Sequence, residues 1–143
     1  MKMLFVLLVS IISFISDAEC GDGITYANEK QTKFDKRFSE YPKIESSPSY
    51  VDGKEQLNNL IESKLQVEDQ GKEMIFRLNY MFTITCSGEI KDFKVLGDAK
   101  MSKLTNIKEI ISNTNGKWNP AKKNGAPVDC IYFAKKTIVG GNY

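Results

Sequence analysis

The sequence predicts an α+β fold, and three observations lead to this prediction. Residues 74 to 84 alternate between an apolar set and a mixed set, which indicates a long strand with one buried face. Apolar residues recur at helical spacing over 57–65 and again over 104–111. Residues 128–139 are rich in β-prone side chains. We therefore expect a two-layer sandwich, with a three-stranded antiparallel sheet and two helices on one face.

The first helix is expected to begin after Asp52. This residue is a good N-cap, and Glu55 stands three residues later in a capping-box pattern. The inner stripe of the helix would consist of Leu57, Leu60, Ile61 and Leu65.

A hairpin is expected next. Ser87-Gly88 marks a tight turn between the strand at Met74–Ile84 and a returning strand at Ile90–Leu96. Ile90 has the parity opposite to the two apolar residues that follow it, which predicts a bulge or an early twist.

The second helix, about Ser102 to Thr114, carries the chain toward the last strand at Val128–Val139, and Asn115-Gly116 supplies its C-cap. A right-handed crossover then places the last strand beside the first. The expected strand order is 2-1-3 with antiparallel pairing throughout, and the last strand lies at an edge.

The composition argues against several classes of function. The chain has 143 residues, 41% of them apolar and 27% charged, with a formal net charge of +2. A charge this small argues against nucleic acid as a partner. There is no histidine, which removes the commonest general base and metal ligand. We see no nucleophile–base pair, phosphate loop or paired carboxylates, so we expect no catalytic residue, metal, cofactor or small-molecule substrate.

The chain is expected to be exported. Residues 1–18 resemble a signal peptide, with a positive start, an apolar run and small residues before the cleavage site. Retention of this segment as an anchor is the alternative. Residues 19–46 read as a polar linker in which Lys36–Ile44 could form a short strand, and 47–143 as the folded domain. The expected location is periplasmic or secreted.

Three cysteines in an oxidising compartment predict one bridge and one leftover thiol. Cys86 ends the first long strand and Cys130 starts its expected antiparallel neighbour, so a disulfide between them is geometrically natural. The alternative is that Cys130 is a small core residue and Cys86 a turn residue. Cys20 would be the leftover thiol.

Three stretches, "SPSYVDGKEQLNNLI", "FTITCSGEIKDFKVL" and "WNPAKKNGAPVDCIYFAKKTI", together resemble the C-terminal domain family of TonB over about Ser47 to Ile138. The resemblance implies the same two-layer fold, and because the residues show no catalytic constellation we expect no enzyme activity. It implies a periplasmic protein-binding module that docks a segment of an outer-membrane receptor or envelope protein by β-augmentation on the last strand. A link to TonB-dependent outer-membrane transport would follow. The linker is too short and too poor in proline for an energy transducer, so we expect a free module.

The resemblance assigns partner contacts to the last strand, at Ile131, Phe133, Lys135, Lys136 and Thr137. It assigns structural roles to Trp118, Pro120, Asn124, Gly125, Pro127, Val128 and Gly88. Several readings stay open. Trp118 either anchors a partner or closes one end of the core. The lysines either steer an acidic peptide or guard an edge strand against aggregation. The apolar pair Ile131 and Phe133 either docks a partner or homodimer, or is covered by Lys36–Ile44. A self-associating structural envelope module is the alternative function.

Overall fold

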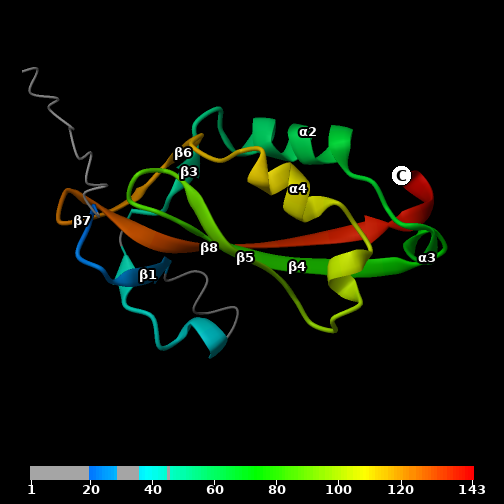
Figure 1. Ribbon diagram of the computed structural model, residues 1–143, viewed down its shortest axis with the longest axis horizontal. Coiled ribbons are helices and arrows are strands. Elements are labelled where there is room, and N and C mark those ends of the chain that lie inside the picture. Colours follow the sequence, from blue (N-terminus) through cyan, green and yellow to red (C-terminus); the bar gives the residue numbers. More distant parts are fainter. Residues whose placement is uncertain (1–19, 29–35, 45) are drawn as a thin grey trace, which may run out of the picture.

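A computed structural model describes residues 20–28, 36–44 and 46–143. The signal-peptide prediction falls on residues outside this part of the chain. The main sheet has the order β2-β1-β8-β4-β5, with β7 also paired to β8 (Figure 1). Its strands are β1 (Thr25–Asn28), β2 (Lys43–Ile44), β4 (Ile75–Ile84), β5 (Ile90–Leu96), β7 (Ala121–Lys123) and β8 (Ala126–Val139).

Three α-helices and a small two-stranded sheet complete the described part of the chain. The helices are α2 (Lys54–Lys64), α3 (Asp69–Lys72) and α4 (Ile107–Ser112). The small sheet pairs β3 (Ser49–Tyr50) with β6 (Trp118–Asn119). Short 3-10 turns are η1 (Lys36–Phe38), η2 (Met101–Lys103) and η3 (Gly140–Asn142).

The predicted three-stranded antiparallel sheet is wrong. The sheet has six strands and is mixed, because β1 runs parallel to β8, from Thr25 opposite Asp129 to Ala27 opposite Ile131. Two of the extra strands, β1 and β2, come from the segment that reads as a polar linker, and β7 comes from the loop before β8. They are two to four residues long, too short to show a period in the sequence.

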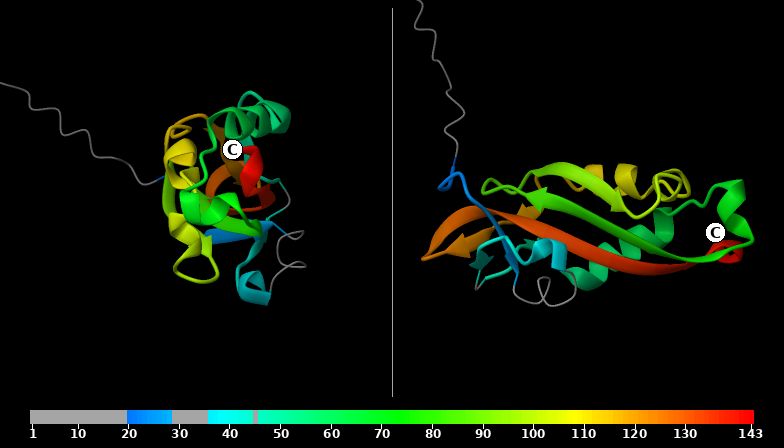
Figure 2. Two further views of the ribbon diagram at one scale, coloured as in Figure 1. Left: turned by 90° about the vertical axis from the view of Figure 1, so that its right-hand side faces the viewer. Right: turned by 90° about the horizontal axis from the view of Figure 1, so that it is seen from below.

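The position of β8 also corrects the prediction of an edge strand. β4 pairs with β8 along one side without a register shift, from Ile75 opposite Val139 to Ile84 opposite Cys130. On the other side, β1 pairs with β8 only from Asp129 to Ile131. From Tyr132 onward, no strand in the described residues pairs with that side. The right-hand view of Figure 2 shows this half of β8 along the rim of the sheet.

Helices α2 and α4 cover one face of the sheet (Figure 1). Leu57 and Ile61 of α2 are buried there, together with Ile107, Ile110 and Ile111 of α4. The capping-box prediction is wrong, because α2 begins at Lys54 with Gly53 as its N-cap and no side-chain cap bond. The stripe nevertheless faces the core, since burial of apolar side chains decides the orientation of a helix more strongly than one capping bond.

The bulge predicted in the hairpin is confirmed. The pairing of β4 with β5 shifts register between Met81 and Thr83, so β5 holds one residue more than the strand opposite. Asp92 in this interval has a positive φ of 55°. The extra residue lets Ile90 and Phe93 both pack against the core.

The N-terminal segments cover part of the opposite face of the sheet. Ala27, Phe38 and Ile131 form a buried cluster, with Met81 and Phe133 packed against it. Of the two readings of Ile131 and Phe133, cover by Lys36–Ile44 is therefore confirmed.

In the described residues, no helix has the length and apolar character needed to cross a bilayer.

Candidate functional site

The candidate site is the groove between α2 and the second half of β8. Its volume is about 520 Å³. α2 contributes Lys54, Leu57, Asn58, Ile61 and Glu62, and the sheet contributes Tyr80 and residues 132–137. The groove runs along the part of β8 that has no strand partner among the described residues on its second side.

The main-chain groups that face this side can be assigned. The N–H of Gly140 donates to the C=O of Met74 at 2.9 Å, and this pair continues the β4–β8 register. Main-chain direction alternates along an antiparallel strand. The main-chain N–H and C=O groups of even-numbered β8 residues therefore face β4. Those of Phe133 and Thr137 are directed away from β4, toward the side on which β1 pairs with Asp129 to Ile131.

An ion pair joins the two walls of the groove. Lys136 contacts the Glu62 carboxylate, and the Tyr143 hydroxyl donates to the other carboxylate oxygen at 2.7 Å. The hydrogen bond from Lys136, and then that from Tyr143, lower the pKa of Glu62 below its ordinary value. Lys136, predicted as a partner contact, thus holds α2 against the sheet.

The other predicted contact residues fall into two groups. Ile131 lies where β8 pairs with β1, and Phe133, Lys135 and Thr137 lie beyond that pairing. Ile131 lies opposite Ala27 of β1 and is only 2% exposed, so it stands outside the open part of the strand. Phe133 is half-buried, with its ring 5.3 Å from that of Phe38. Lys135 is exposed, with its ammonium 5.4 Å from the Phe133 ring centroid, and Thr137 is exposed.

Trp118 closes one end of the core. It is 4% exposed, and its Nε1–H donates to the Thr114 hydroxyl at 3.0 Å. Its ring meets those of Tyr50, Phe82 and Tyr132 at centroid distances of 5.0 to 5.5 Å. The core-closing interpretation of Trp118 is confirmed.

The remaining motif residues build the hairpin that leads into β8. Asn124 and Gly125 both have positive φ, 51° and 80°, as a two-residue hairpin turn requires. Pro127 pairs with Lys122, and the buried Val128 with Ala121. Pro120 stands between β6 and β7.

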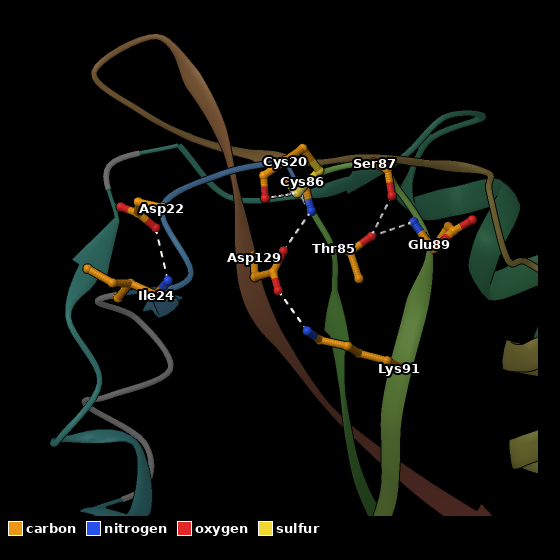
Figure 3. Close-up of a disulfide and its surroundings, with 9 residues drawn as sticks. All are labelled: Cys20, Asp22, Ile24, Thr85, Cys86, Ser87, Glu89, Lys91 and Asp129. Carbon is orange, nitrogen blue, oxygen red and sulfur yellow. Dashed lines mark hydrogen bonds and ion pairs between the residues drawn. A yellow bond between two sulfur atoms is a disulfide. The ribbon is translucent and has the colours of Figure 1, made fainter. Parts of the chain in front are cut away.

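The predicted disulfide between Cys86 and Cys130 is wrong. Cys86 bonds to Cys20 instead, with the Cα atoms 5.8 Å apart (Figure 3). Cys130 is a free, fully buried thiol in a cluster with Tyr26, Ile44 and Val128, and burial raises its pKa to about 12. Geometry along the strands suggested the wrong pair because Cys130 points into the core, whereas the turn at Cys86 faces the N-terminal segment.

Sequence reasoning missed the α2 wall of the groove. Lys54, Asn58 and Glu62 occupy one side of the helix, and their spacing of four was the signal that they share a face.

Among the described residues, no group of three or more acidic or cysteine side chains is placed to hold a metal ion. No family model matches the chain, and no curated protein is similar to it at a significant level.

Proposed function

We propose that this chain is a protein-binding module that accepts an extended peptide as an added strand along the second half of β8. The observation that carries the proposal is the run from Phe133 to Thr137, where outward main-chain groups lie beside the α2 groove. Each added main-chain hydrogen bond contributes about 0.5–1.5 kcal/mol net, so a few of them with one buried side chain give useful affinity.

The resemblance to the TonB C-terminal domain family supports the same mode of binding. On that basis the proposed partner is a segment of an outer-membrane receptor or envelope protein, with a link to TonB-dependent transport. The disulfide is consistent with export to an oxidising compartment, where we propose that the protein acts. The proposed site is shorter than the strand predicted from sequence, because Ile131 pairs with β1.

A pair of variants at Thr137 tests the site. Thr137→Pro removes an outward N–H without removing a bond to β4, whereas Thr137→Ala keeps the N–H and loses only the side chain. Peptides are selected from a displayed random library on the immobilised oxidised chain 20–143, and their affinities for both variants are then measured. We expect Thr137→Pro to weaken binding about tenfold or more, which corresponds to 1.4 kcal/mol, and Thr137→Ala to leave it nearly unchanged.

Two controls make the result decisive. Circular dichroism and thermal unfolding must show that Thr137→Pro is folded. Selected peptides that bind Thr137→Pro as tightly as the unsubstituted chain would contradict the proposal. The alternative, self-association through the same edge, would appear in sedimentation as a dimer that selected peptides do not dissociate.

A further inference from the structure

The same side of β8 has two consecutive parts, and the first is occupied by the protein itself. We call Cys20–Asn28, which includes β1, the N-terminal arm. Its β1 residues pair with Asp129, Cys130 and Ile131, and the open part begins two residues later at Phe133. Because Ile131 has the same parity as Phe133, its N–H is directed toward β1. The arm therefore blocks main-chain groups that continue directly into the proposed peptide site.

The arm is fastened covalently beside the strand that it covers. Cys20 bonds to Cys86, which follows the end of β4. Asp129, at the start of the covered part of β8, accepts the N–H of Cys86 at 2.9 Å and the Nζ of Lys91 at 2.8 Å. Figure 3 shows Asp129 between these two donors, next to the disulfide.

The non-covalent hold on the arm is small. β1 makes three register pairs with β8, and β2 makes only two with β1. Tyr26 and Ala27 are buried, whereas Cys20 to Ile24 are exposed, and Gly21 and Gly23 have positive φ. A strand with so few pairs depends on its fastening, because a short segment with few hydrogen bonds and few buried contacts otherwise separates readily from a sheet.

We propose that the Cys20–Cys86 disulfide controls a second strand-accepting segment of β8, at Asp129 to Ile131. While the bond is intact, the arm fills this segment. When the bond is reduced, the arm leaves, and the open edge extends back from Phe133 to Asp129. This gives one longer acceptor for an extended chain.

The reductant is a dithiol, and its thiolate attacks the sulfur of Cys20, the exposed residue of the bonded pair. The S–S bond breaks, Cys86 leaves as a thiolate that takes up a proton, and a mixed disulfide forms at Cys20. The second thiol of the reductant then displaces Cys20 and closes a cyclic disulfide. Two electrons and two protons pass to the protein, which gains two thiols.

Amide hydrogen exchange measured by NMR on the chain 20–143 tests the inference without any peptide ligand. The Ile131 N–H faces β1, whereas the Tyr132 and Ala134 N–H groups face β4. On reduction with dithiothreitol, we expect Ile131 to exchange at least about tenfold faster and Tyr132 and Ala134 to change less than about twofold. The variant Cys20→Ser should show the fast Ile131 rate without reductant and no response to dithiothreitol.

Unchanged exchange at Ile131 would overturn the inference, because the arm would then stay in place without the bond. An equal increase at Ile131, Tyr132 and Ala134 would also overturn it, since the whole sheet would have loosened. Thr137 separates this inference from the proposed function. Its N–H faces the open part, so slow exchange there in both redox states would contradict the peptide site and leave the test of the arm intact.

Discussion

Gly88 and Gly116 both have left-handed backbone conformations, yet only Gly88 lies against another part of the chain. Their φ angles are 82° and 75°. A Cβ on Gly88 would lie 2.4 Å from the Trp118 carbonyl oxygen, whereas a Cβ on Gly116 would meet nothing within 4 Å. The tight turn predicted at Gly88 thus also fixes the position of the residue that closes the core.

This pair of glycines gives the first prediction. Gly116→Ala should destabilise the fold by about 1 kcal/mol, the cost of the left-handed conformation alone. Gly88→Ala should cost about 1–3 kcal/mol more, because the β6 backbone must move away. Urea unfolding followed by circular dichroism measures both variants. Equal losses would show that the Gly88 turn yields without disturbing Trp118.

Glu62 gives a prediction about pH. Its pKa is lowered by Lys136 and Tyr143, so its stabilising contribution is complete above the unfolded-state value of about 4.3 and disappears as pH falls through the folded-state pKa. The carboxylate is half exposed, which limits the contribution to about 1 kcal/mol or less. Glu62→Gln should therefore be less stable than the unsubstituted chain at pH 6, and the two should converge near pH 3.

Urea unfolding at several pH values measures this difference. Glu89→Gln, at an exposed carboxylate on the β4–β5 turn, is the control for replacing a carboxylate by an amide. If the difference for Glu62→Gln stayed constant down to pH 3, the groove walls would be joined by packing and not by this ion pair.

At the scale of elements, the bulge in β5 depends on one unusual residue. Asp92 has φ 55°, a conformation that aspartate tolerates and a β-branched residue does not. Asp92→Val should cost about 1–2 kcal/mol. Lys94→Val, in the same strand and also exposed, is the matched control and should be neutral or slightly stabilising. If both variants behaved alike in thermal unfolding, the positive φ at Asp92 would carry no energetic cost.

The long elements could be predicted from sequence and the short ones could not. Ten residues of alternation locate β4, and the parity of Ile90 alone predicts the bulge. α4, expected over Ser102 to Thr114, is shorter than predicted because η2 and a loop replace its first turns. β1 and β2 left no periodic signal, although Tyr26 and Ile44 are buried core residues. Because β1 and β2 are not predicted, the predicted disulfide and the predicted position of β8 at the sheet edge are also wrong.

At the scale of the whole molecule, this N-terminal region decides where the domain begins. The sequence predicts a domain that starts at residue 47. Without β1, it gives no sign that only the second half of β8 lacks a strand partner on one side. Phe38 packs on Ile131 and Phe133 of the second sheet face, and Tyr26 and Ile44 pack on Val128. We infer that the folded domain includes Phe38 and Ile44, which lie before residue 47.

Removal of residues 20–46 tests this inference. Chains 20–143 and 47–143, both carrying Cys86→Ser, differ in the covering residues but not in the disulfide. Each large apolar side chain that loses its burial costs about 1.5–3 kcal/mol, and the shorter chain lacks Phe38 and Ile44. The shorter chain should therefore have a lower urea midpoint, and in sedimentation it should self-associate through the uncovered Ile131 face. Equal midpoints and a monomeric 47–143 would restore the domain boundary at residue 47 and reduce the N-terminal segments to a removable cover.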